Sequence, residues 1–338
     1  MLWLKRIAKI ISVLVLSLVF FLGLMYRADI PSEELVEKYS TPQSHFIEVD
    51  GLNVHVRFMG EGDPIFLLHG SFSSLHTWDV WQKELSPYFM TISLDFPGHG
   101  LTGPDELKRY SIEDYSHLVQ RIAEKLSIEK FHLAGNSMGG AVALEIATSR
   151  PDKVLSLNLI DASGAPQRAQ RTVSTGDSTQ TTSRPLIFRV AENPVFSKIL
   201  LKCTPKFLFA KNLQEVYGDK SKVNEAAVDR YYELMLMQGN RKATLDRLSQ
   251  SRRKEFDFSR LTMPTLILWG EKDSWISVSN AYSFESAILG SNLVIFPEAG
   301  HVPMEEIPTE SVSEYLSFLG VEVRKNYLDP SKQLVYAD

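Results

Sequence analysis

The chain has 338 residues, of which 44% are hydrophobic and 23% are charged, and its formal net charge is −5. This composition is typical of a globular protein and excludes a disordered chain. The mild charge gives no reason to expect nucleic acid as a partner. The single cysteine, Cys203, excludes an intramolecular disulfide, and no Cys/His cluster has the spacing of a metal site. Because no motif surrounds Cys203, we expect a buried structural thiol rather than a nucleophile.

Residues 1–30 differ from the rest of the chain and predict a membrane anchor. Basic residues precede an uncharged run from Ile10 to Tyr26, which as a helix would span about 26 Å, close to the thickness of a hydrocarbon core. The alternative is a cleaved signal peptide, but the sequence after the run offers no good cleavage site. Because acidic residues follow the run, the charge pattern predicts a cytoplasmic N-terminus and an exported main domain. In a bacterium that domain would be periplasmic.

The main part of the chain alternates between short apolar runs and helical stretches. After a helix-like linker at residues 31–39, the alternating pattern of residues 45–60 around Asp50-Gly51 predicts a β-hairpin. Continuous apolar runs separated by helical patterns then predict a parallel sheet that is buried on both faces. The runs are 65–68, 91–94, 131–134 and 154–160, and the helical patterns are 75–85, 112–126 and 138–148.

An insertion interrupts this alternation at residues 163–255. Its first part, 167–184, is polar and predicts a mobile loop, whereas residues 185–248 are helical in pattern and rich in aromatic side chains. The alternation then resumes with strands at 264–269 and 292–296 and helices at 277–288 and 307–319. We therefore expect one α/β domain, with a polar tail at 321–338 and a helical cap inserted between its two parts, 45–162 and 256–320.

The pattern G-x-S-x-G occurs once in a context that suits a nucleophile. It reads Gly135-Asn136-Ser137-Met138-Gly139, after an apolar strand and before a helical stretch. A tight strand-to-helix turn would hold Ser137 in a strained backbone conformation at the end of the sheet. The small residues at positions 135 and 139 let strand and helix approach closely. The sequence therefore predicts Ser137 as the nucleophile rather than as an incidental serine in a glycine-rich turn.

A serine nucleophile needs a base, and an acid that orients the base. His301 is the best candidate base among the eight histidines, because it lies in a shaped loop between the last strand and the last helix. Asp273, in the loop after the preceding strand, is the expected acid. Asp161, at the end of the strand before the insertion, is the alternative. Glu271 and Glu298 are expected to be solvated.

The oxyanion of an acyl-transfer intermediate needs two backbone N–H donors. Met138, directly after the nucleophile, is expected to supply one of them. The other should come from the loop after the first core strand, where Ser71 is favoured over Phe72. His69 and His99 are expected to be structural residues of their loops.

Five segments in this order, FLLHGSFSS, LDFPGHGLT, LAGNSMGGAVALEIA, LILWGEKDSW and PEAGHVPMEE, resemble the α/β-hydrolase superfamily over residues 45–320. The resemblance implies the α/β-hydrolase fold, a mostly parallel central sheet flanked by helices. The family's nucleophile, acid and base fall on Ser137, Asp273 and His301, and its oxyanion donors fall on Ser71 and Met138. Epoxide hydrolases and haloalkane dehalogenases carry aspartate at the elbow, so Ser137 argues against both classes.

With the membrane helix, the elbow is most similar to that of the membrane-anchored monoacylglycerol lipase-like branch. We therefore expect a serine hydrolase of hydrophobic or lipid-like esters that needs no metal or organic cofactor. One alternative is a carbon–carbon bond hydrolase of the ring-cleavage-product type with the same triad. Another, from a different class, is a non-catalytic binding protein on this fold, although such proteins usually lose a triad member.

Overall fold

The structure is a computed structural model that describes residues 2–166, 197–199, 201–250 and 254–322. The loop expected at 167–184 lies outside the described residues. An eight-stranded sheet runs through the centre of the domain in the order β1-β2-β4-β3-β5-β6-β7-β8. The strands are β1 (Ser44–Val49), β2 (Leu52–Met59), β3 (Pro64–Leu68), β4 (Met90–Leu94), β5 (Phe131–Asn136), β6 (Val154–Ile160), β7 (Thr265–Gly270) and β8 (Asn292–Phe296).

The sheet is parallel from β4 to β8, and β2 pairs antiparallel with both β1 and β4. The expected hairpin is confirmed: β1 and β2 meet at Asp50-Gly51, where both residues have positive φ angles, 49° and 85°. Each expected core strand is found within a residue or two of its predicted ends. The chain has the α/β-hydrolase fold.

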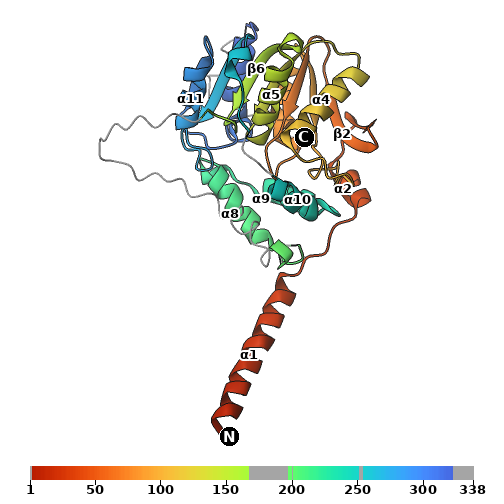
Figure 1. The fold of residues 1–338 in the computed structure, drawn as a ribbon, viewed down its shortest axis with the longest axis vertical. Helices are drawn as coiled ribbons and strands as arrows, with labels where there is room; N and C mark the ends of the chain where they lie inside the picture. Colours follow the sequence, from red (N-terminus) through yellow and green to blue (C-terminus); the bar gives the residue numbers. More distant parts are fainter. Residues whose placement is uncertain (1, 167–196, 200, 251–253, 323–338) are drawn as a thin grey trace, which may run out of the picture.

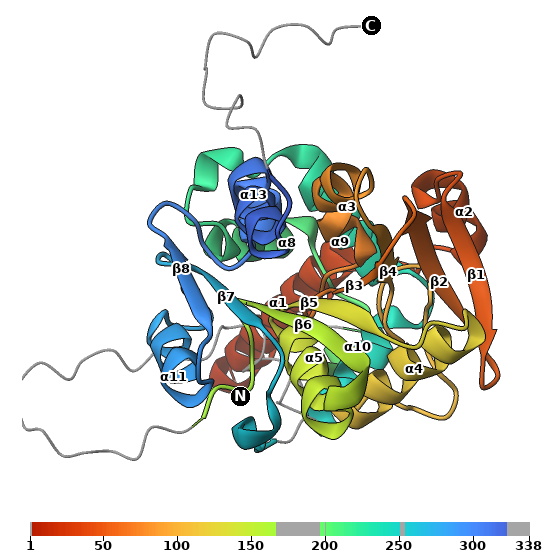
Figure 2. The ribbon, with the colours of Figure 1, turned by 90° about the horizontal axis from the view of Figure 1, so that it is seen from above.

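Apolar side chains project from both faces of the central strands, which explains the continuous apolar runs in their sequences. In β3, Ile65 and Leu67 pack on one face, whereas Phe66 and Leu68 pack on the other. The first face is covered by α3 (Asp79–Leu85) and α13 (Pro308–Phe318), as Figure 2 shows. The opposite face is covered by α4 (Ile112–Lys125), α5 (Met138–Ser149) and α11 (Ser279–Ala287).

One expected helix is divided, and another is found as predicted but follows an additional short helix. The segment predicted as a helix at 75–85 begins as a 3₁₀ turn, Leu75–Trp78, before α3. The last helix, predicted at 307–319, is preceded by a short α12 (Pro303–Glu306) and begins anew at Pro308. Proline cannot donate a backbone hydrogen bond within a helix, but it is tolerated at the first turn.

Between β6 and β7 the chain forms the insertion helices α8 (Lys206–Val216), α9 (Glu225–Leu236) and α10 (Asn240–Gln250). Figure 1 shows them between the α/β core and the N-terminal helix α1 (Leu2–Met25). Within the described part of the chain, α1 is the one helix long and apolar enough to cross a membrane, over Trp3–Met25. It begins before the uncharged run and therefore includes the three basic residues near the N-terminus.

The segment after α1 is attached to the insertion. The N–H of Arg27 donates to the carbonyl of Lys202 at 2.8 Å, and the N–H of Ile30 donates to that of Leu236 at 2.8 Å. The guanidinium Nε of Arg241 donates to Asp29 at 3.1 Å. Cys203 lies at this junction, where its thiol donates to the carbonyl of Leu22 at 3.5 Å. The thiol is only half-buried, so the expectation of a buried residue is wrong.

Candidate active site

Ser137 occupies the turn between β5 and α5 with a backbone that ordinary residues avoid. Its φ is 53° and its ψ is −116°, in the region that glycine prefers. Its N–H donates to the carbonyl of Ile160 at 3.1 Å, which ties the turn to the neighbouring strand. A side chain at Gly139 would collide with the backbone of Leu68 and His69, so only glycine lets α5 begin this close to β3. The turn thus presents Ser137 at the carboxyl end of the sheet.

His301 and Asp273 form a buried pair in two loops at the same edge. The imidazole Nδ1 of His301 lies 2.7 Å from a carboxylate oxygen of Asp273. The other oxygen of Asp273 accepts backbone N–H groups from Trp275 at 2.7 Å and Ile276 at 2.9 Å. The main chain of His301 is held on both sides, because its N–H donates to Val216 at 2.7 Å and its carbonyl accepts from the Asn136 amide at 2.9 Å. The orientation of the ring is therefore fixed before any ligand binds.

Asp161, the alternative acid, is also at this site. Candidate ligand atoms of Asp161, Asp273 and His301 all lie within 4.8 Å of one another. Asp161 is fully buried; one of its oxygens accepts the N–H of Gly270 at 3.0 Å, and the other has no hydrogen-bond partner within the described ranges. Burial raises the pKa of Asp161 well above its usual value, and the nearby charge of Asp273 raises it further. Of the two carboxyl groups, Asp273 makes the 2.7 Å contact with His301.

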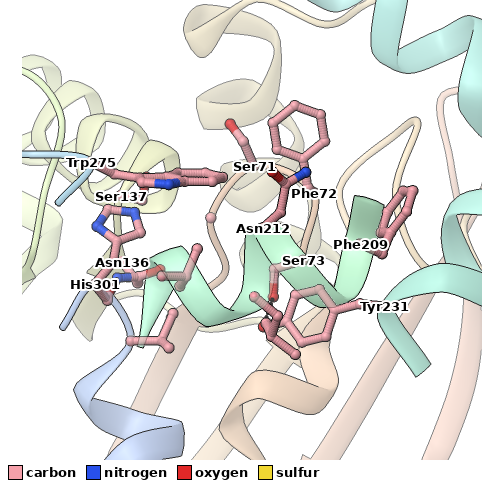
Figure 3. Close-up of a pocket in the computed structure, with 14 residues that line it drawn as sticks. Ser71, Phe72, Ser73, Asn136, Ser137, Phe209, Asn212, Tyr231, Trp275 and His301 are labelled. Carbon is pink, nitrogen blue, oxygen red and sulfur yellow. Dashed lines mark hydrogen bonds between the residues drawn. The ribbon is translucent and has the colours of Figure 1, made fainter. Parts of the chain in front are cut away.

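A pocket with about 560 Å³ of empty space opens beside Ser137 and His301. Figure 3 shows Ser137, His301 and Trp275 together at one side of it, with Phe209 and Tyr231 at the other. Measured by exposed surface, the pocket wall as a whole is mostly apolar. Its lining also includes Ser71, Phe72, Ser73, Asn136, Asn212, Leu213, Val216 and Val302. Sequence reasoning did not select any of the insertion residues, because neither a motif nor a spacing marks them.

The two expected oxyanion donors lie on adjacent elements. Ser71 lines the pocket, and Met138 follows Ser137 as the first residue of α5. The hydroxyl of Ser71 donates to the thioether of Met138 at 3.6 Å, so the two residues are in contact. Phe72, the other candidate, has a positive φ of 63°. The roles of Ser71 and Met138 stay predictions.

His69 and His99 have structural surroundings. His69 is fully buried; its Nδ1 lies 2.8 Å from the carbonyl of Gly70 and its Nε2 accepts the N–H of Phe96 at 3.1 Å. His99 is buried beside it, with ring centroids 5.1 Å apart. Burial lowers the pKa values of both imidazoles, so both are neutral at neutral pH.

Two glutamates of α12, which the sequence reasoning missed, join the site to the insertion. Glu305 accepts the hydroxyls of Tyr217 at 2.9 Å and Tyr231 at 2.5 Å, and the guanidinium of Arg230 at 3.0 Å. Glu306 accepts three backbone N–H groups, from Gly218, Asp219 and Gly300. Because Gly300 directly precedes His301, its hydrogen bond to Glu306 stabilises the loop that carries His301. The signal in the sequence was an acidic pair directly after that loop.

A serine at a helix N-terminus, beside a histidine whose other nitrogen is held by a carboxylate, can carry out acyl transfer. The imidazole can take the serine proton, the carboxylate stabilises the imidazolium, and the helix terminus favours the developing oxyanion. The apolar wall can hold the hydrocarbon part of a substrate.

Comparison with known proteins agrees with this geometry. The family model described as the alpha/beta hydrolase fold matches residues 63–308, so the chain belongs to the α/β-hydrolase family. The dihydrolipoyllysine-residue acetyltransferase component of the acetoin cleaving system of Pseudomonas putida is 28% identical, over 87% of this chain and 74% of that protein. A monoacylglycerol lipase of Bos taurus is 27% identical, over 77% of this chain and 76% of the lipase.

Among solved structures, a membrane phospholipase A described as a bacterial virulence factor is similar to the chain beyond the core. It superposes with a TM-score of 0.70 at 25% identity, covering 93% of this chain and 98% of the phospholipase. The relatives named above differ in activity, so family membership supports hydrolysis in general and leaves the substrate to be argued from the site.

Proposed function

We propose that this protein is a serine hydrolase that cleaves carboxylic esters with a hydrophobic, lipid-like acyl group. The proposal depends most on one observation: Ser137, on its strained turn, lines the same pocket as His301, which is paired with Asp273 at 2.7 Å. Three residues of this kind, far apart in sequence and converging at one pocket, are the components of acyl transfer.

In the proposed reaction, Ser137 Oγ attacks the ester carbonyl carbon while His301 Nε2 takes its proton. The backbone N–H groups of Ser71 and Met138 stabilise the oxyanion of the tetrahedral intermediate. Collapse of this intermediate breaks the ester bond, and His301 returns the proton to the leaving alcohol. Water activated by His301 then hydrolyses the acyl-enzyme and releases the acid.

The preference for a hydrophobic ester is supported by the pocket wall. Phe209, Leu213, Trp275 and Val302 present apolar surface to a substrate bound at Ser137. Each buried methylene of an acyl chain contributes about 0.8 kcal/mol to binding. The similarity of the chain to a monoacylglycerol lipase and to a membrane phospholipase also supports a lipid-like substrate.

We expect the full-length protein in non-ionic detergent to hydrolyse nitrophenyl esters, with a clear preference for longer chains. From acetate to octanoate, kcat/KM should rise by about tenfold or more, because the added methylenes are buried against the apolar wall. Initial rates over the series from acetate to palmitate measure this. If a folded preparation cleaved none of these esters, the proposal would fail, and ring-cleavage diketones would be the next substrates to try.

We also propose that α1 is a retained membrane anchor, that the enzyme acts near lipid, and that its main domain is exported. The proposal is supported by the apolar span Trp3–Met25 and by the hydrogen bonds that attach Arg27 and Ile30 to the insertion. In a bacterial host, a fusion of alkaline phosphatase to the C-terminus should be active. A cytosolic reporter such as green fluorescent protein at the same position should be silent. The reverse pattern would refute the exported topology, and release of a shortened soluble protein would refute a retained anchor.

A further inference from the structure

Arg247, on helix α10, is a buried charge without a counter-ion in the described part of the chain. Only 6% of its surface is exposed. Its Nη1 lies 3.5 Å from the thioether of Met138, whereas its Nε and Nη2 atoms have no hydrogen-bond partner among the residues that the structure describes. Among the described residues, no carboxylate forms an ion pair with it. An arginine stays charged in proteins, so burial without a partner is costly and requires an explanation.

The groups around Arg247 do not neutralise it. His69 and His99 are close enough for the guanidinium to lower their pKa values, in addition to the larger effect of burial. Asp95, a buried carboxylate of this region, is already engaged by His55 at 2.7 Å and by two backbone N–H groups, those of Leu75 and Leu101. Asp95 is therefore held by other partners, and it makes no ion pair with Arg247 among the described residues.

The guanidinium contacts two residues of the candidate active site. One is Met138, the residue after the nucleophile, whose thioether also accepts the hydroxyl of Ser71. The other is Phe72, whose ring centroid lies 5.8 Å from the guanidinium carbon. Phe72 lines the main pocket and also a second pocket, of about 250 Å³, which His99 lines as well. Arg247 is thus one side chain away from both pockets.

The contacts with Phe72 and Met138 are adaptable. A cation over an aromatic face is attracted to it, but the ring satisfies none of the N–H donors in the plane of the guanidinium. Methionine is unbranched and changes rotamer easily, so its thioether can give way to a better hydrogen-bond acceptor. A ligand anion would supply the acceptors that Nε and Nη2 lack.

We propose that Arg247 binds an anionic group of the substrate, so that the enzyme prefers esters that carry a phosphate or carboxylate near the ester bond. This inference rests on the proposed ester hydrolysis and specifies its substrate class. A guanidinium presents paired N–H donors in a plane, which matches phosphate and carboxylate oxygens. The apolar wall would hold the acyl chain while the anionic group of the alcohol part reaches toward Arg247.

The test compares three lauroyl esters in the same non-ionic micelles: monolauroylglycerol, which is neutral, lauroyl lysophosphatidic acid, and lauroyl glycolate. The wild-type enzyme should have the higher kcat/KM on at least one of the anionic esters. Arg247→Met, which keeps the length of the side chain, should lower the anionic-to-neutral ratio by about tenfold or more, and Arg247→Lys should restore part of it. The phosphate and carboxylate arms identify which anion is preferred.

The matched control is Lys242→Met, which removes a positive charge from the same helix where the side chain is 61% exposed. It should leave the ratio unchanged. A ratio that stays the same in Arg247→Met, or that falls equally in Lys242→Met, would overturn the proposal, whatever the loss in total rate. A merely structural role would lower all three rates together.

A binding measurement tests the anion site independently of the proposed ester hydrolysis. Lauryl phosphate contains no carboxylic ester and should bind the full-length protein about tenfold or more tightly than it binds Arg247→Met, as measured by calorimetry. Equal affinities would refute the anion site even if esters were cleaved. Arginine-dependent affinity without ester cleavage would refute the ester hydrolase and retain the anion site.

Discussion

Replacement of Ser137 with alanine should lower kcat on the preferred nitrophenyl ester by roughly 10⁵-fold or more. The reason is that no acyl-enzyme can form without the hydroxyl, and binding plus the oxyanion donors leave only a small residual rate. A fluorophosphonate probe should label the wild-type protein on the peptide that contains Ser137 and should leave the alanine variant unlabelled. The wild-type protein and the alanine variant should bind lauryl phosphate equally, which would show that the pocket is intact.

Ser137→Gly separates the catalytic role from the structural one. Because Ser137 has a φ of 53° and a ψ of −116°, glycine should relieve backbone strain of about 1 kcal/mol or more. The glycine variant should therefore be inactive yet unfold at a higher temperature than the wild type, by calorimetry of the detergent-solubilised protein. Substantial ester hydrolysis by either variant would remove Ser137 from the role of nucleophile.

The core strands, their parallel sheet and the turn that carries Ser137 could be predicted because local sequence patterns indicate them. Apolar runs such as 131–134 belong to strands buried on both faces, and the small residues around Ser137 let strand and helix approach closely. The pairing of His301 with Asp273 could also be expected, since loops that follow parallel strands meet at one edge of the sheet. The sequence could not exclude Asp161 as the acid, because it follows a strand of the same sheet.

The walls of the pocket could not be predicted, for a physical reason. Phe209 and Tyr231 reach the site through the packing of α8 and α9 on the core, and nothing in their local sequence differs from that of any amphipathic helix. The same holds for Arg247, whose position beside Met138 depends on how α10 packs. Glu305 was not selected because its partners, Tyr217, Tyr231 and Arg230, are far from it in sequence.

Asp273→Asn should lower kcat by about 10³- to 10⁴-fold, whereas Asp161→Asn should cost less than about tenfold. Asp273 makes the 2.7 Å contact with His301, and two backbone N–H groups stabilise the carboxylate charge of Asp273. The side-chain amide of an asparagine at position 273 would instead favour the wrong tautomer of His301. Burial and the charge of Asp273 raise the pKa of Asp161 and so favour its neutral form. An asparagine at position 161 is therefore close in charge and shape to the native group. Equal losses in the two variants would contradict this assignment.

The same pair predicts a pH dependence in the Asp273→Asn variant. Without the negative charge at position 273, Asp161 loses the largest of the charge effects that raise its pKa, and ionised Asp161 can then take over the orientation of His301. The ionised fraction grows as pH rises, so the residual activity of Asp273→Asn should increase relative to that of the double variant Asp161→Asn/Asp273→Asn. Taking this ratio cancels the pH effects that do not depend on Asp161. A ratio independent of pH between about 5 and 9 would show that Asp161 stays protonated and does not replace Asp273.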